Sequence, residues 1–278
     1  MGKVLGVTAI GPGKEYVGTF LEHTFARIDG VDSWRVLLDN VPCPVTAPPD
    51  NLVFQNAGEY TGPDNRFARI AWTRELLRQY FLTTDATHLL MLDSDVIPPA
   101  DVVARLLAHE TPISSAALLV RDCSLPQLTI EWIDLGVALR DSTEFHVSQS
   151  GMGCMLVDRA TIARVSFREP SFYAADSIGE DFQWCLDAGA PTLLDASLCC
   201  WHVSANGAGN RITIGERTTT ATYKGSPDYV TNGYGCWANN VPRADLTPDQ
   251  MATLGPDFVV RAGRALGVEW RTALEILA

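Results

Sequence analysis

The chain has 278 residues, 46% of them hydrophobic and 19% charged, which is enough apolar material for one large core. Its net charge of -12 and pI near 4.8 disfavour a nucleic-acid partner, because such binding relies on clustered Lys and Arg, although a local basic groove is not excluded. The N-terminal apolar run lacks a basic leader with a cleavage site, and no run reaches the roughly 18 residues of a membrane-spanning helix, so we expect a cytoplasmic protein without a membrane span.

The first part of the chain alternates apolar strands with amphipathic helices. Strands are predicted at Lys3–Ile10, Ser33–Leu38, Leu52–Gln55 and Thr87–Leu92. Helices are predicted at Tyr16–Ile28, Asn65–Leu82 and Val102–His109. The strand predicted at Thr87–Leu92 is continuously apolar, which is typical of a strand covered on both faces. This β-turn-α-β order predicts a doubly wound α/β domain.

The rest of the chain carries shorter elements and ends in a predicted helical tail. Further strands are predicted at Ile113–Val120, Gln127–Trp132, Phe145–Val147, Cys154–Val157, Thr192–Leu194 and Ser197–Trp201. Helices are predicted at Arg159–Val165 with Asp158 as its cap, at Glu180–Leu186 closed by Gly189, and within Pro248–Ala278. The segment 203–240 is dense in Gly, Asn and Thr and is predicted to be a long loop. With no repeat and no low-complexity linker, a single domain is expected.

Two aspartates mark the end of the most apolar strand. Asp93 and Asp95 flank Ser94 where that strand stops, and α/β folds bind their ligands at the carboxyl ends of strands. Neighbouring carboxylates repel each other unless a cation or strong hydrogen-bond donors offset them. Oxygen ligands of this kind suit Mg²⁺ or Mn²⁺. The alternative is that both residues cap a turn or the helix that follows.

His202 adds a nitrogen ligand to this candidate metal site. It comes directly after a predicted strand, so it can complete a carboxylate and imidazole site for Mn²⁺, although a histidine after a strand is also often structural. The adjacent Cys199 and Cys200 raise a zinc alternative, but successive side chains of a strand face opposite ways. The seven cysteines include no CxxC pair, which indicates free, mostly buried thiols in a reducing compartment.

Glu180 and Asp181 open a predicted helix after a glycine. Acidic residues are favourable at the positive end of a helix, which is the structural explanation for both. The functional interpretation is that one of them is a general base within reach of an acceptor hydroxyl.

These motifs, in this order, resemble those of glycosyltransferases of the GT-A fold, including their family 2-like group. The run Ala86–Pro99 resembles the DxD region, and Ser150–Arg159 resembles the acceptor-side strand. Gly179–Asp181 resembles the ED motif, and Trp201-His202 resembles the closing metal ligand. The match covers about residues 1–205 in element order.

The resemblance implies a fold and a domain organisation. The expected fold is α/β, of the GT-A type, with a single Rossmann-like mixed sheet flanked by helices and a C-terminal loop and helical extension. Residues 1–205 would form the core that binds the nucleotide sugar, and residues 206–278 the acceptor-side loop and C-terminal helices of the same domain.

The resemblance also implies roles for the motif residues. Asp95 and His202 would ligate Mn²⁺ or Mg²⁺, and Asp93 would contact that metal or the donor ribose. Asp181 would be the catalytic base of an inverting enzyme, with Glu180 beside it. Retaining enzymes share the metal ligands but need no base there, so the stereochemistry stays open.

Five further residues are assigned to the nucleotide-sugar donor, for which a UDP-sugar is favoured over a GDP-sugar. Asp39 would hold the base or ribose, and Arg66 and Arg69 would lie near the diphosphate or the nucleotide. Thr8 and Ser94 would be additional donor-binding residues. Each arginine has the alternative of being a solvated helix residue.

The sequence therefore predicts a metal-dependent hexosyl- or pentosyltransferase with an unidentified acceptor. One alternative is a nucleotidyltransferase of related fold, although Gly11–Lys14 is only a fragment of its Gly-rich signature. The other is a noncatalytic protein that binds a nucleotide sugar, which the joint presence of the acidic motifs and His202 disfavours.

Overall fold

The computed structural model describes residues 2–14, 17, 21, 24–26, 28–44, 48, 50–63, 65–118, 144–169, 179–202, 208–214 and 217–222. Its strands are β1 (Val4–Ile10), β2 (Ser33–Leu38), β3 (Leu52–Asn56), β4 (His88–Leu92), β5 (Val96–Ile97), β6 (Ile113–Leu118), β7 (Glu144–Val147), β8 (Cys154–Asp158), β9 (Thr192–His202), β10 (Ala208–Ile214) and β11 (Arg217–Thr222). Its helices are α2 (Arg66–Leu82), α3 (Val102–Ala108), α5 (Arg159–Arg164) and α6 (Glu180–Ala188). Within these residues, no helix is both long and apolar enough to cross a bilayer.

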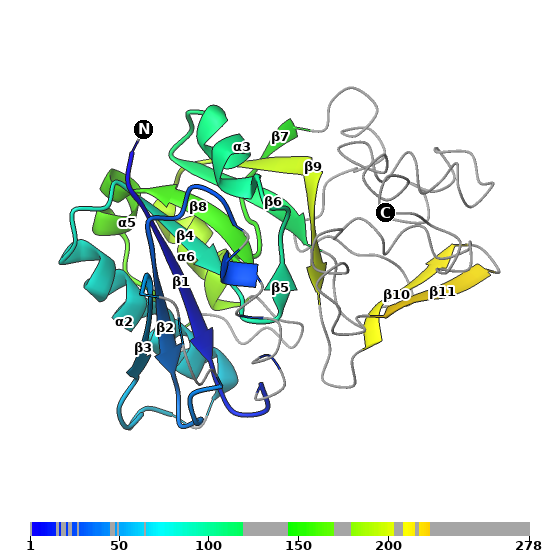
Figure 1. Cartoon of the computed structure of the whole chain (residues 1–278). Coiled ribbons are helices and arrows are strands. Elements are labelled where there is room, and N and C mark those ends of the chain that lie inside the picture. The colour runs from blue at the N-terminus through cyan, green and yellow to red at the C-terminus, as the bar shows by residue number, and fades with distance from the viewer. Residues whose placement is uncertain are drawn as a thin grey trace.

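Nine of the described strands form one mixed sheet, in the order β3-β2-β1-β4-β8-β6-β9-β5, with β7 also paired to β9 (Figure 1). β3, β2, β1 and β4 are parallel, whereas β8 runs antiparallel between β4 and β6. This arrangement confirms the predicted α/β class with a single mixed sheet flanked by helices.

Both faces of the sheet are covered, which explains why its central strands are continuously apolar. In β4, Leu90 and Leu92 belong to one core cluster, together with residues of α3 and of the segment 17–28. Leu89 and Met91 point into the other cluster, with residues of α2, α5 and α6. Successive side chains of a strand alternate between faces, so both sets must be apolar.

Local sequence signals fix the ends of three helices. Asn65 precedes α2 and its side chain accepts a hydrogen bond from the backbone N–H of Phe67. The carboxylate of Asp158 accepts one from Thr161 N, as its predicted capping role requires. Gly189 ends α6 with a φ of 59°, a left-handed conformation that favours glycine.

The structure corrects three of the expectations. Thr192–Leu194 and Ser197–Trp201 belong to one strand, β9, whose pairing with β6 shifts register after Asp195. β5, a strand of two residues, was not predicted. Part of the predicted 203–240 loop is an antiparallel hairpin of β10 and β11. The predicted strand Gln127–Trp132 and the helical tail Pro248–Ala278 lie outside the described residues.

Candidate active site

The acidic pair after β4 lies in the turn that leads into β5. Asp93 N donates to Gly153 O at 2.9 Å, which ties the start of the turn to a neighbouring segment, and Val96 N donates to Asp93 O at 3.0 Å, which closes the turn. The side chain of Asp95 is 2% exposed and forms an ion pair with Lys14. The side chain of Asp93 is 42% exposed, which leaves one carboxylate of the pair accessible to a ligand.

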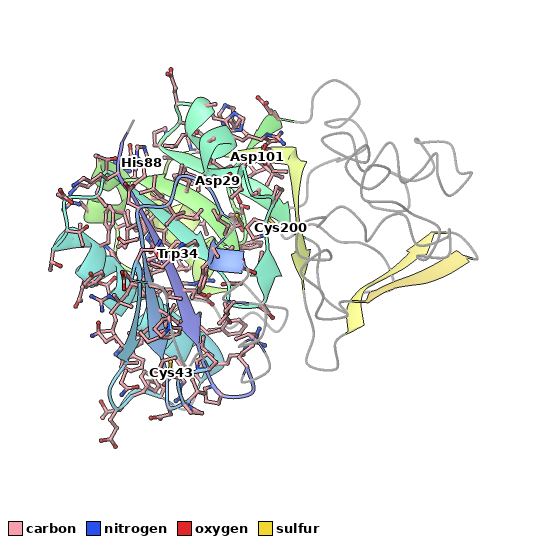
Figure 2. All side chains as sticks on the ribbon, viewed as in Figure 1. Asp29, Trp34, Cys43, His88, Asp101 and Cys200 are labelled. Carbon is pink, nitrogen blue, oxygen red and sulfur yellow. The ribbon has the colours of Figure 1, made fainter. Side chains whose placement is uncertain are left out.

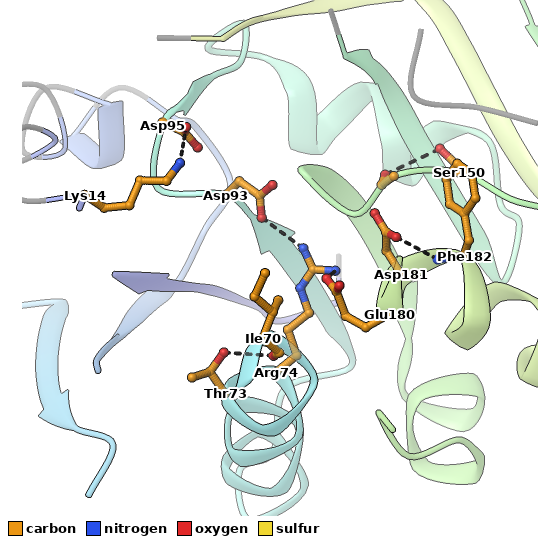
Figure 3. A network of polar contacts seen from close by, with 11 residues as sticks. Lys14, Ile70, Thr73, Arg74, Asp93, Asp95, Ser150, Glu180, Asp181 and Phe182 are labelled. Atoms are coloured by element: carbon orange, nitrogen blue, oxygen red, sulfur yellow. Dashed lines mark hydrogen bonds and ion pairs between the residues drawn. The ribbon is translucent and has the colours of Figure 1, made fainter. Parts of the chain in front are cut away.

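Arg74 of α2 connects this acidic pair to the Glu180-Asp181 pair. Its Nη2 lies 3.0 Å from Asp93 Oδ1 and its Nη1 lies 2.8 Å from Glu180 Oε1 (Figure 3). Arg74 and Glu180 are both buried. The half-buried Asp181 instead turns its Oδ1 to the backbone N–H of Phe182, at 2.8 Å. Arg74 therefore engages Glu180, whereas Asp181 accepts its hydrogen bond from the backbone.

Burial changes the protonation of this group. Desolvation raises the pKa of Glu180 to about 7, although the charge of Arg74 acts to lower it. Desolvation also raises the pKa of Asp181, again against the effect of Arg74. For Arg74, burial alone would lower the pKa, but the negative charges of Glu180 and Asp93 outweigh it and the pKa is raised. Because one buried cation lies among three carboxylates, Glu180 is partly protonated near neutral pH.

A second ion pair lies at the carboxyl end of β2. The buried Asp39 accepts two hydrogen bonds from Arg69, from Nε to Oδ2 at 2.5 Å and from Nη2 to Oδ1 at 2.7 Å. The guanidinium carbon of Arg69 lies 5.9 Å from the centre of the Tyr60 ring. This cluster offers a charged edge and an aromatic face, which are the groups that a nucleoside can contact.

The charged residues of these contacts and Tyr60 line one pocket of about 560 Å³. The predicted site residues that line it are Thr8, Asp39, Arg66, Arg69, Asp93, Ser94, Asp95, Glu180 and Asp181. Thr8 is buried, and its Oγ1 has no hydrogen-bond partner within the described structure. A buried polar atom of this kind in a pocket wall is suited to a ligand contact.

His202 was predicted to lie just past a strand, and it is the last residue of β9. β9 runs antiparallel to β5 with His202 opposite Val96, the residue that follows Asp95. The fold thus brings the backbone of His202 beside the acidic turn; its side chain lies outside the described structure.

The charge of the pocket fits a divalent cation. Five carboxylates line it, from Asp39, Asp93, Asp95, Glu180 and Asp181. Among the described residues, four cations line it, from Lys14, Arg66, Arg69 and Arg74, so the formal charge is -1 with every carboxylate ionised and zero when Glu180 holds its proton. Such a pocket has no net positive charge to attract an anionic diphosphate unless a cation enters with it, and carboxylate oxygens are suitable ligands for Mg²⁺ or Mn²⁺.

Sequence analysis missed two of the cations. Arg74 follows Arg66 by eight positions and Ile70 by four, so helical spacing places it on the pocket-lining face of α2. This helical spacing could have identified Arg74 as a candidate pocket residue from the sequence. Lys14 follows the Gly11–Gly13 turn, which sequence analysis weighed only as a fragment of a nucleotidyltransferase signature.

A third acidic group lies elsewhere and contains a histidine. Potential ligand atoms of His109, Glu144 and Asp195 lie within 4.8 Å of one another. Arg105 Nη2 is also 3.3 Å from the carboxylate of Asp195. None of these residues lines the pocket described above. The Arg105 guanidinium engages Asp195, the buried carboxylate of this group.

The comparisons with known proteins concern the fold. No protein-family model matches the sequence, and no curated protein matches it significantly. Among solved structures, A197 from STIV shares 14% identity with a TM-score of 0.49, over 81% of this chain and 95% of that one.

Two other solved structures that the chain resembles are glycosyltransferases with GT-A-like folds. TarS from S. aureus shares 10% identity with a TM-score of 0.42, over 70% of this chain and 35% of that one. GalNAc-T7, solved with UDP, GalNAc and Mn²⁺, shares 10% identity with a TM-score of 0.47, over 99% of this chain and 56% of that one. This chain thus spans 35% of the length of TarS and 56% of the length of GalNAc-T7. Because both TM-scores are below 0.5, a proposal for the function depends on the residues of the pocket and not on these two structures.

Proposed function

We propose that the protein is a metal-dependent glycosyltransferase that moves a sugar from a nucleotide-sugar donor, with a UDP-sugar favoured, to an acceptor hydroxyl. The observation that carries this proposal is the convergence of Asp39, the Asp93–Asp95 turn and the Glu180-Asp181 pair on one pocket. These residues come from separate parts of the chain and offer a nucleoside contact, a metal contact and a base.

In the proposed donor complex, the pocket residues divide along the length of the donor. Asp39, Arg69 and Tyr60 would hold the nucleoside, and Arg66 would lie near the diphosphate. Asp93, Asp95 and His202 are the proposed ligands of Mn²⁺ or Mg²⁺. When bound, this cation would supply positive charge against the negative charge that builds on the departing diphosphate.

Asp181 is the proposed base of an inverting transfer. It would take the proton of the acceptor hydroxyl as the oxygen bonds to the anomeric carbon and the bond from that carbon to the phosphate oxygen breaks. The raised pKa of Asp181 supports this role, because a carboxylate with a pKa nearer to neutral is a better proton acceptor. Glu180 would hold Arg74, and through it Asp93, in place.

Thermal unfolding with nucleotides tests this function. UDP, GDP, UTP and GTP are added separately, each with Mn²⁺ and with EDTA. We expect UDP with Mn²⁺ to stabilise the protein most, by about 2.7 kcal/mol at 100 times its dissociation constant. Equal stabilisation in EDTA would contradict metal dependence. A response to triphosphates alone would favour the nucleotidyltransferase alternative, and no response to any nucleotide would overturn the proposal.

A further inference from the structure

Lys14 reaches the pocket from the loop after β1. Its backbone N–H donates to Gly11 O at 3.1 Å and its carbonyl accepts from Val17 N at 3.1 Å, so the loop holds the base of the side chain. The side chain is 26% exposed, and its ammonium pairs with Oδ2 of Asp95 (Figure 3). A flexible cation therefore lies against the carboxylate that is proposed as a metal ligand.

The ammonium and a divalent cation compete for Asp95. An ammonium in contact with a carboxylate oxygen blocks that oxygen as a metal ligand, and the two positive charges repel each other in a partly buried site. Binding of a cation at Asp95 therefore requires Lys14 to move. The loop keeps the displaced ammonium at the rim, because Gly11, Pro12 and Lys14 all line the pocket.

Arg69 and Arg74 each pair with a carboxylate that is not a proposed metal ligand, Asp39 and Glu180 respectively. Arg69 makes two hydrogen bonds to Asp39, and Arg74 lies between Asp93 and Glu180. The carboxylate in the ion pair of Lys14, Asp95, is itself a proposed metal ligand, so a bound metal would take this partner from Lys14. A diphosphate arriving with the metal presents new anionic oxygens, and an ammonium on a flexible stem is a good ligand for phosphate.

We propose that Lys14 exchanges its Asp95 contact for a phosphate oxygen of the nucleotide-sugar donor, so that metal and nucleotide strengthen each other's binding. This inference rests on the proposed function and adds a donor-binding residue to it. Its thermodynamic consequence is reciprocal: Lys14 weakens binding of the metal alone and strengthens binding of the diphosphate with the metal.

Binding measurements on full-length Lys14→Met test the exchange. Mn²⁺ binding without nucleotide is followed by electron paramagnetic resonance, and UDP binding in saturating Mn²⁺ by calorimetry. Lys3→Met is the matched control, because Lys3 pairs with Asp85 at an exposed position. We expect Lys14→Met to bind Mn²⁺ alone about tenfold more tightly and UDP with Mn²⁺ about 10-fold to 100-fold more weakly, the range of a lost charge-assisted hydrogen bond.

Lys14→Arg keeps the positive charge and serves as the rescue variant. It should recover most of the UDP affinity, whereas Lys3→Met should match the wild type in both measurements. If Lys14→Met and Lys3→Met both bind UDP and Mn²⁺ like the wild type, Lys14 has no phosphate role while the proposed function stands. If the wild type itself binds no nucleotide in Mn²⁺, the proposed function and the role of Lys14 are both overturned.

Discussion

Arg74 lies among three carboxylates, between Asp93 and Glu180 and near Asp181. A single buried cation offsets one negative charge, so the remaining acids raise one another's pKa. Glu180 forms an ion pair with Arg74, whereas the side chain of Asp181 accepts a hydrogen bond from the backbone N–H of Phe182. This difference supports the positioning role that we propose for Glu180 and the base role that we propose for Asp181.

Asp181→Asn removes the proton acceptor with almost no change of shape. If transfer inverts the anomeric centre, its rate should fall by about 10²-fold to 10⁴-fold, the range of general base catalysis, while UDP affinity in Mn²⁺ stays near the wild-type value. Asp187→Asn is the control, because Asp187 is on the same helix and pairs with Arg168 instead. Undiminished transfer by Asp181→Asn would favour a retaining mechanism or a purely structural role.

Glu180 should make stability depend on pH. Its pKa rises from an ordinary 4.5 to about 7 in the folded protein, so the folded state holds this proton more tightly than the unfolded chain does. The resulting stability is fully present below pH 4.5 and is lost as pH rises through 7, on the order of 3 kcal/mol. In thermal unfolding between pH 4.5 and 8, the free energy of unfolding should fall less with rising pH for Glu180→Gln than for the wild type. Parallel curves would contradict this assignment.

At the scale of elements, β1 and β2 set the position of the end of the pocket that Asp39 lines. Gly6 of β1 pairs in register with Trp34 of β2. The Trp34 ring is buried in the interior and lies 4.3 Å from the Phe25 ring, centre to centre (Figure 2). A side-chain carbon on Gly6 would lie 2.4 Å from Trp34 Cε3, so the indole occupies the space that a larger residue would need.

Gly6→Ala should therefore destabilise the protein, because the indole must move within a packed core. We expect a loss of about 1–3 kcal/mol, the usual range for overpacking, measured by urea unfolding. In the Trp34→Val background, which removes every ring atom, Gly6→Ala should be less destabilising. An equal loss in both backgrounds would show that Trp34 is not the cause.

At the scale of the whole molecule, the proposed metal site joins parts of the chain that the sheet alone brings together. Asp95 follows β4, and His202 ends β9 opposite Val96. The overall charge of -12 opposes an anionic donor that arrives without a cation, and the pocket has no net positive charge to attract one. The metal dependence that we propose would thus arise from the assembled fold.

Asp95→Asn and His202→Ala should each abolish the dependence of UDP binding on Mn²⁺, because each removes a proposed ligand at a strand end. The measurement is the UDP-induced rise in melting temperature, with Mn²⁺ and with EDTA. His146→Ala is the matched control, because His146 is exposed on β7. If His202→Ala responds to Mn²⁺ like the wild type, His202 is not a metal ligand. The result for Asp95→Asn then tests Asp95 separately.

The sequence by itself determined the central strands, the helix ends and the acidic motifs. The continuous apolar run of β4 and the caps at Asp158 and Gly189 depend on near neighbours in the chain, so local patterns were sufficient. The same holds for Asp93 and Asp95, whose position at a strand end follows from where the apolar run stops.

Only the tertiary structure decided which charges meet. Lys14 pairs with Asp95 across 81 positions, and Arg74 reaches Glu180 from another helix. The single strand β9, which carries His202 back beside the acidic turn, also depends on its pairing with β5. Such contacts depend on strand order and helix packing, to which residues far apart in the chain contribute together, and no local pattern encodes them.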